Sequence, residues 1–181
     1  MTKDSLLELQ MLNELIGYYR QTGERERLEA VIERSLDVAG LPELMNRDGG
    51  RLSFATTLLN AANGYRSIGE LDKSRTLYGE VEEIYKELLP EEDMLHAGLH
   101  NNISLLYQEK KQYDRAKEHL LRALNIVTVN NAGFETAVTY ANLANTSIIE
   151  ATELAMSNDE TKAAKVFLEA EEYAAEAIKQ K

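Results

Sequence analysis

Asparagine recurs inside segments of this chain that otherwise have the composition of helices. The seven residues concerned are Asn13, Asn60, Asn63, Asn101, Asn102, Asn142 and Asn145. Inside a helix asparagine is roughly 0.5 to 0.7 kcal/mol less favourable than alanine, so its return at equivalent places needs a cause. A carboxamide offers both a donor and an acceptor. The pattern predicts a row of hydrogen-bonding amides, whose partners are either a ligand or neighbouring helices and water.

Arginine is the second side-chain type that could engage a ligand. Arg20 and Arg66 occupy equivalent places one helical turn after the asparagines, and Arg51 is a third candidate. A guanidinium can hold a carboxylate with two parallel hydrogen bonds. The alternative in so acidic a chain is an ion pair with Glu24 or Glu70.

Metal binding and catalysis find little support in the sequence. His96 and His100 are four residues apart, which places both rings on one helical face, and Glu92 could be a third ligand at the same spacing. The chain has no cysteine, however, and His100 stands where such a unit packs its helices. No phosphate-binding glycine loop, nucleophile elbow or thiol is present. We expect no metal, no cofactor and no enzyme activity.

Several groups of acidic residues remain to be explained. They comprise Glu80, Glu82, Glu83, Glu91, Glu92, Asp93, Glu171 and Glu172. We interpret them as a solvated outer face that keeps the protein soluble. The alternative is a surface for a basic partner.

The elements that carry these side chains form a unit repeated at roughly 40 residues. The clearest copy, Asn101 to Val127, indicates two helices joined by a tight turn. Steps of three and four residues place the apolar and small side chains of its second helix on one face: Tyr113, Ala116, Leu120, Ala123, Leu124 and Val127. Forty-two residues upstream the same positions hold Leu71, Ser74, Tyr78, Val81, Glu82 and Tyr85. Such self-similarity is typical of a solenoid.

The unit resembles the tetratricopeptide repeat. That family has a small residue midway along its first helix, then an aromatic residue, a turn glycine, and small residues in the second helix. Matching residues are Ala62, Ser104, Ala144, Tyr65, Tyr107, Gly23, Gly69, Ala116 and Ala123. The period of about 42 and the phrase from Asn101 to Tyr107 are similar to the longer, kinesin-light-chain type of repeat. Departures are Lys111 in place of the turn glycine and Ser147 in place of the aromatic residue.

We therefore expect an all-α fold, a right-handed α-solenoid of antiparallel helix pairs, as one domain over residues 1–181. The predicted pairs span about 5–40, 51–89, 92–129 and 135–179. Ser5 with Glu8, and Ser157 with Glu160, have the spacing of capping boxes. Seven extra residues in the last pair make two additional turns, which we place in its first helix.

Composition limits the partners and the compartment. The formal net charge of −11 opposes binding to nucleic acid and to anionic membranes. The chain has no segment of the ~18 to 20 apolar residues that a membrane span needs, and its first residues do not form a signal peptide. We expect a cytoplasmic protein.

The resemblance implies a protein–protein interaction scaffold that binds a peptide or protein segment in a concave groove lined by the first helices. In the family, asparagines matching Asn60, Asn102 and Asn142 bond to the backbone of the bound peptide. We extend the predicted groove to Asn60, Asn63, Arg66, Asn101, Asn102, Asn142 and Asn145. The alternatives are a regulatory or sensor segment of a larger bacterial protein, and a self-associating assembly module that forms a homodimer through its C-terminal helix.

Overall fold

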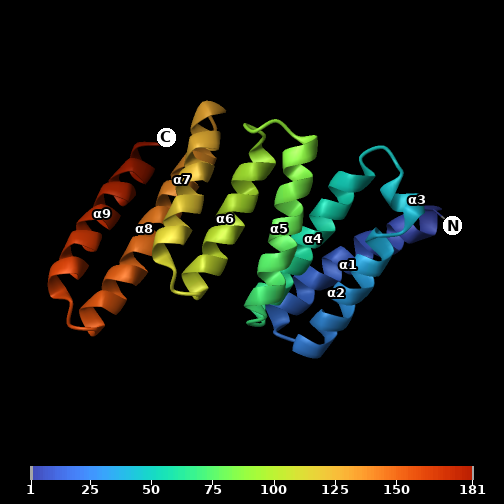
Figure 1. Ribbon diagram of the computed structural model, residues 1–181, viewed down its shortest axis with the longest axis horizontal. Helices are drawn as coiled ribbons and strands as arrows, with labels where there is room; N and C mark the ends of the chain where they lie inside the picture. Colours follow the sequence, from blue (N-terminus) through green and yellow to red (C-terminus); the bar gives the residue numbers. More distant parts are fainter. Residues whose placement is uncertain (1, 181) are drawn as a thin grey trace. The chain divides into compact units, whose positions relative to one another are not determined.

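The computed structural model describes residues 2–180, and every regular element in that range is a helix (Figure 1). This confirms the all-α prediction. The helices are α1 Thr2–Thr22, α2 Arg25–Ala39, α3 Pro42–Met45, α4 Gly50–Ser67, α5 Leu71–Leu88, α6 Met94–Glu109, α7 Tyr113–Val129, α8 Gly133–Met156 and α9 Glu160–Lys179.

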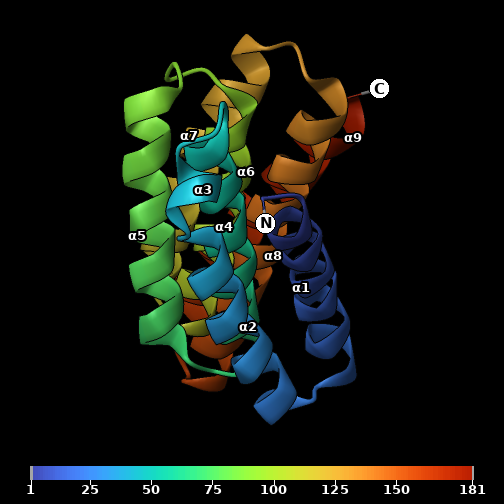
Figure 2. The same ribbon diagram turned by 90° about the vertical axis from the view of Figure 1, so that its right-hand side faces the viewer.

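The chain divides into two compact units, Met1–Leu89 and Pro90–Lys181. Unit 1 contains the antiparallel pairs α1–α2 and α4–α5, with the short α3 between them, and unit 2 contains α6–α7 and α8–α9 (Figure 2). Within each unit the first helices of the two pairs, α1 with α4 and α6 with α8, lie in contact. The first helix of each pair is thus placed beside its equivalent, as a groove lined by first helices requires.

Small side chains mark the closest helix contacts, as the repeat pattern predicts. Ala62 and Ser74 are fully buried in the α4–α5 pair, and Ala116 and Ala123 are fully buried in unit 2. A small side chain at these points lets the ridges of one helix enter the grooves of the next. Larger residues then complete the core of unit 1, where one cluster is formed by Ile16, Leu28, Ile32, Ala61 and Tyr65.

The turns between paired helices share one backbone feature. Gly23 and Gly69 adopt the left-handed conformation, with φ of 73° and 81°. Lys111 and Asn158 take the equivalent place in the later pairs, with φ of 57° and 62°. The turn geometry is therefore kept where the glycine is lost, and Lys111 holds a conformation that costs a non-glycine residue roughly 1 kcal/mol.

The helix starts differ from two sequence predictions. Helix α1 begins at Thr2, so Ser5 does not cap it, and Ser5 Oγ lies 3.4 Å from Glu43 Oε1 in the α3 segment. The cap of α9 is Asp159, whose carboxylate accepts from the Lys162 N–H, and not Ser157. Ser157 instead donates to the Glu153 carbonyl and closes the end of α8.

The seven extra residues of the last pair lie where the sequence predicts. Helix α8 has 24 residues, the longest of the described helices. None of the described helices combines the length and the apolar character that crossing a bilayer requires.

Candidate functional site

The predicted asparagines of unit 2 connect its two first helices. Asn142 Nδ2 on α8 donates to Asn101 Oδ1 on α6 at 3.0 Å. Asn101 Nδ2 donates in turn to the Ala97 carbonyl of its own helix at 3.1 Å. Each amide is partly buried, so the bond is shielded from water and holds α8 in register with α6.

Unit 1 contains the same bridge in the same register. Asn60 Nδ2 on α4 donates to Asn13 Oδ1 on α1 at 3.2 Å, and Asn13 Nδ2 donates to Thr57 Oγ1 at 3.3 Å. The asparagine row therefore forms bonds between neighbouring helices in both units. Because a carboxamide has two N–H groups and an oxygen with two lone pairs, Asn60 and Asn142 keep donor and acceptor capacity beyond these bonds.

Two other predicted residues of unit 1 have different surroundings. Asn63 is 9% exposed, and its Oδ1 accepts from the Tyr78 hydroxyl on α5 at 2.6 Å. We correct the prediction that Asn63 lines a groove, because its carboxamide is used inside the α4–α5 contact. Arg66 lies partly buried in the last turn of α4.

Asn102 and Asn145 are the predicted amides that face outward in unit 2. Asn102 is partly exposed on α6 and donates to the Gly98 carbonyl at 2.9 Å, a bond within its own helix. Asn145 is exposed on α8. Neither amide joins two helices, so both can rearrange to meet a ligand.

Apolar side chains surround these two amides. The residues that point outward beside them, which we call the α6–α8 face, are Leu95, Gly98, Asn102, Leu105, Val138, Ala141, Asn145 and Ile148. Leu95, Val138 and Ile148 are 47%, 40% and 46% exposed. No charged residue belongs to the face, although 28% of the chain is charged. An uncharged surface of this kind, in so acidic a protein, suits the burial of another apolar surface.

The equivalent positions on α4 of unit 1 are polar instead. Ser53, Thr56 and Asn60 stand where α6 has Leu95, Gly98 and Asn102, and Ser67 stands where α6 has the exposed Glu109. Two of these hydroxyls, those of Thr56 and Ser67, bond to carbonyls of α4 itself. Helix α1 of the same unit does expose apolar side chains, among them Leu7 and Met11 at 58% and 59%.

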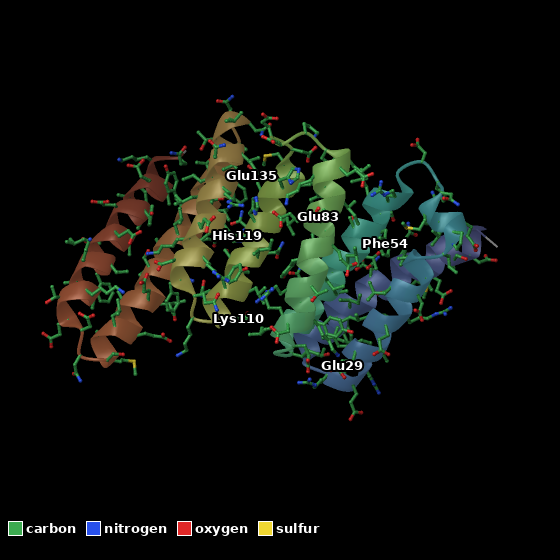
Figure 3. The ribbon with its side chains drawn as sticks, viewed as in Figure 1. Glu29, Phe54, Glu83, Lys110, His119 and Glu135 are labelled. Carbon is green, nitrogen blue, oxygen red and sulfur yellow. The ribbon has the colours of Figure 1, made fainter. Side chains whose placement is uncertain are left out.

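The histidines of unit 2 form a pair that the sequence did not predict. His100 Nδ1 on α6 lies 3.1 Å from Nδ1 of His119 on α7, and the His119 ring stacks on Tyr107 with centroids 5.4 Å apart (Figure 3). At this distance one nitrogen donates and the other accepts. The described residues contain no cluster of three or more potential ligands that could hold a metal ion.

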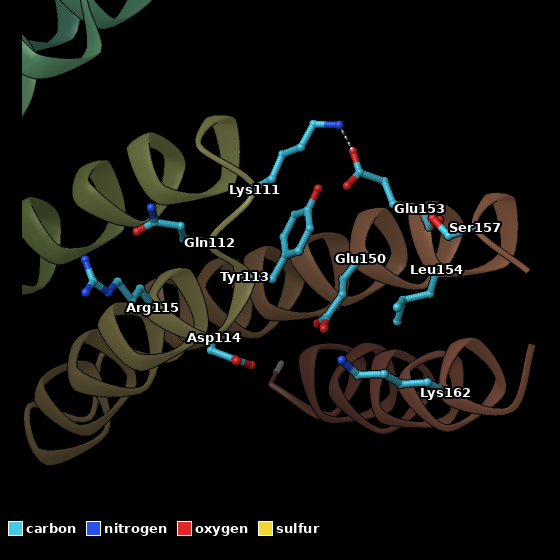
Figure 4. A pocket seen from close by; sticks show the side chains of 10 residues that line it. All are labelled: Lys111, Gln112, Tyr113, Asp114, Arg115, Glu150, Glu153, Leu154, Ser157 and Lys162. Carbon is cyan, nitrogen blue, oxygen red and sulfur yellow. Dashed lines mark hydrogen bonds and ion pairs between the residues drawn. The ribbon is translucent and has the colours of Figure 1, made fainter. Parts of the chain in front are cut away.

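A cavity of about 550 Å³ opens between the start of α7, the end of α8 and the start of α9 (Figure 4). Lys111 Nζ lies 2.7 Å from Glu153 Oε1 at its rim. Burial, followed by the hydrogen bond to Glu153, raises the pKa of Tyr113 to about 12. The hydrogen bonds from Lys111 and then Tyr113 hold the pKa of Glu153 below its usual value. These charges largely compensate one another, so the cavity shows no preference for one ligand charge.

A network of ion pairs joins α7, α8 and α9 near this cavity. Lys117 Nζ on α7 lies 3.0 Å from Glu150 Oε2 on α8 and 3.2 Å from Glu169 Oε2 on α9, and Tyr173 donates to Glu169. Burial would lower the pKa of Lys117, but hydrogen bonds to both glutamates outweigh it and raise that pKa. The network ties three helices together.

One repeated contact, between a cation and a tyrosine ring, was not predicted from the sequence. A cation from the second helix lies over the ring of the tyrosine near the end of the first helix in three successive pairs. The pairs are Arg27 over Tyr19, Lys73 over Tyr65 and Arg115 over Tyr107. Each cation follows its tyrosine by eight residues, which is the signal that could have revealed it. Ser147, where the aromatic residue is missing, ends the series.

Comparisons with known proteins support the helical-repeat fold. The model of the family described as "Tetratricopeptide repeat" matches residues 53–128. No curated protein matches the chain. Among solved structures, two of a Podospora anserina putative kinesin light chain with nearly identical TPR-like repeats, one of them a point-substituted variant, each share 14% identity and a TM-score of 0.60. The match to the variant covers 92% of this chain and 94% of the variant's chain. The match to the other structure covers 94% of this chain and 97% of that chain.

A structure of BtubC (BKLC) from P. vanneervenii shares 16% identity and a TM-score of 0.54, and covers 99% of this chain and 89% of that one. At such low identity these likenesses establish the fold alone. Residues 53–128 therefore match the tetratricopeptide repeat, and the all-α solenoid fold of the chain is similar to that of the TPR-like repeat structures.

Proposed function

We propose that the protein is a non-enzymatic scaffold that binds a peptide or protein segment on the α6–α8 face. The observation that carries this proposal is the face itself, which is apolar, exposed and free of charge. Burying its leucine, valine and isoleucine side chains would supply the driving force. The exposed amides of Asn102 and Asn145 would bond to the backbone of the bound segment.

The bridge between Asn142 and Asn101 has a supporting role in this proposal. Because it fixes α8 against α6, the two halves of the face are positioned before a ligand arrives, and less entropy is lost on binding. Asn101 and Asn142 therefore position the face. In unit 1, Asn60 and Arg66 stay candidates for polar contacts with a longer segment.

The test is selection from a phage-displayed library of random peptides of about 16 residues, long enough to cover the face as a helix or a strand. Kd is then measured on synthetic copies of the selected peptides. Val138→Glu with Ile148→Glu places two charges on the face at exposed positions, which should leave the fold intact. We expect a loss of affinity of at least about tenfold, because a buried unpaired charge is costly.

Ala30→Glu on α2 with Thr76→Glu on α5 is the matched control, because it adds the same two charges to exposed positions of the second helices of unit 1. It should leave the affinity unchanged. Unchanged affinity in the Val138→Glu/Ile148→Glu variant, with normal circular dichroism, would refute the proposal.

Self-association through α9 is a second candidate function. Phe167, Leu168 and Ile178 are 40%, 61% and 73% exposed on this last helix. Light scattering across a concentration series tests it, and Leu168→Glu with Ile178→Glu should abolish any dimer that depends on this surface. A mass that stays monomeric at all concentrations excludes this function.

The same proposal covers the compartment and the excluded partners. The net charge of −11 opposes nucleic acid and anionic membranes, and the sequence without cysteine agrees with a reducing compartment. We place the protein in the cytoplasm, which fractionation of a tagged chain would check.

A further inference from the structure

The surroundings of the α6–α8 face define the charge of its partner. At one end lie the last turns of α6 and α8, where Lys111 pairs with Glu153 and positive and negative groups balance. The other end begins at Leu95 and at the first turn of α8. The charged residues that directly precede α6 and those in the first turn of α8 are all acidic.

Glu91 and Glu92 precede α6, and Glu135 lies in the first turn of α8. Their carboxylates make no ion pair with the rest of the described chain. Two contacts bring them together. Asn130 Nδ2 donates to the Glu92 carbonyl at 2.8 Å, which ties the start of unit 2 to the turn before α8.

The second contact is the bridge from Asn142 to Asn101. Seven residues make about two helical turns, so the residue seven places before another lies on nearly the same side of a helix. Seven residues before Asn142 is Glu135 on α8, and seven residues before Asn101 is Met94 on α6. Glu135 (labelled in Figure 3) therefore lies on the side of α8 that faces the start of α6, which Glu91 and Glu92 precede. We call these three carboxylates the acidic end.

The positive helix ends do not cancel this charge. Asp93 already occupies the α6 terminus, where its carboxylate accepts from the Leu95 N–H at 2.9 Å. A helix terminus carries only about half a charge, which falls off within a turn. The last turn of α7 carries no basic residue, and Lys179 in the last turn of α9 pairs with Glu176.

We propose that the partner is a segment with apolar anchors at its centre and two or more lysine or arginine residues at one end. This inference rests on the proposed function of the α6–α8 face. The apolar anchors bury side chains of the face, while the basic end lies over Glu91, Glu92 and Glu135. Complementary charge would give the segment one orientation and a faster association rate. The face is roughly 15 Å long between Leu95 and Leu105, which suits a helix of about three turns or an extended segment of about five residues.

The experiment uses the full chain and the same random peptide library. Enriched peptides should combine apolar residues with a basic cluster at one end. A synthetic peptide of the most enriched sequence is then titrated against Glu91→Gln/Glu92→Gln/Glu135→Gln. At about 50 mM salt we expect its Kd to rise at least about fivefold, and the effect should shrink at about 500 mM salt because salt screens exposed charges.

The matched control is Glu14→Gln/Glu26→Gln/Glu80→Gln, which removes the same net charge from exposed positions of unit 1. It should leave Kd within about twofold, because distant exposed charges are screened. Peptides enriched without basic bias, or an equal Kd in both triple variants, would overturn the inference while leaving the proposed function standing. If the library yields the same peptides on the Val138→Glu/Ile148→Glu variant as on the wild-type protein, both the inference and the proposed function would be overturned.

Discussion

Asn142 on α8 and Asn101 on α6 share a hydrogen bond of 3.0 Å, and Asn60 and Asn13 repeat this bond in unit 1. The bond explains why an unfavourable helix residue is used at these points. A carboxamide reaches the neighbouring helix and offers both N–H donors and an oxygen acceptor, which an alkyl side chain cannot do. Asn102, one residue further along α6, makes only a local bond. Neighbouring asparagines therefore have different roles.

This division gives the first prediction. Asn142→Ala should lower the free energy of unfolding by about 1 kcal/mol, because it removes a partly buried hydrogen bond and leaves the Asn101 oxygen without its donor. Asn102→Ala should change that free energy by less than about 0.5 kcal/mol, because alanine favours the helix and offsets the lost local bond. Urea denaturation of both variants measures the difference.

Peptide affinity completes that comparison. Asn102→Ala should lower the affinity for the library-selected peptide and leave the stability nearly unchanged. Asn142→Ala should lower both the affinity and the free energy of unfolding. If Asn102→Ala destabilised the protein and left the peptide affinity unchanged, its amide would be structural.

The network at Lys117 gives the second prediction. Its side chain is 13% exposed and that of Glu150 is 10% exposed, so removing the cation leaves a carboxylate with little access to water. Lys117→Met should therefore cost about 3 kcal/mol of unfolding free energy, measured by urea denaturation. The Lys117→Met/Glu150→Gln double variant should recover part of the lost free energy of unfolding.

Arg122→Ala is the control for Lys117→Met. Arg122 and Glu118 form an exposed pair on the same helix, and such pairs contribute within about 1 kcal/mol. Equal effects of the two substitutions would show that the Lys117 network is as weakly stabilising as a surface pair.

Titration of Tyr113 gives the third prediction. Its pKa of about 12 in the folded protein exceeds the ordinary value of 10.0. A raised pKa means that the folded state holds the proton more tightly, so the contribution to stability is complete below a pH of about 10 and is lost as the pH rises toward about 12. The wild-type spectrum should contain one tyrosinate transition at the raised pKa that is missing from Tyr113→Phe. A difference titration in which Tyr113 ionises at the ordinary value would contradict the assigned burial.

Much of the fold followed from the sequence because small and apolar residues recur at helical spacing on the faces where helices pack. Ala116, Ala123 and Ser74 were predicted as contact points and are fully buried. The extension of α8 followed from counting residues in whole turns. The left-handed turn at Lys111 was not visible, because its residue type argues against the conformation that the repeat imposes.

The site was less predictable. Periodicity places Asn63 and Asn60 on neighbouring parts of one helix, but it does not give the helix-crossing geometry that brings Tyr78 onto Asn63. Exposure of Val138 and Ile148 was equally hidden, because an apolar residue at helical spacing is normally predicted to lie in the core. They are exposed because the contacts of α8 with α7 and α9 leave that side of the helix uncovered.

Gly98 gives the last prediction. It lies in the middle of α6, is exposed, and has nothing within 4 Å of the place that a side chain would occupy. Glycine at such a position costs roughly 0.5 to 1 kcal/mol relative to alanine. Gly98→Ala should therefore stabilise the fold by about that amount in urea denaturation.

The same substitution should weaken peptide binding if the bound segment passes close over the α6 backbone. A more stable protein with lower affinity has a simple cause, since the added methyl group blocks approach to the α6–α8 face. Gly79→Ala on α5 is the matched control, because Gly79 is also exposed within a helix and has open space above it. It should stabilise equally and leave affinity unchanged. Equal affinity in Gly98→Ala and wild type would place the ligand backbone away from Gly98 and restrict the contact to side chains.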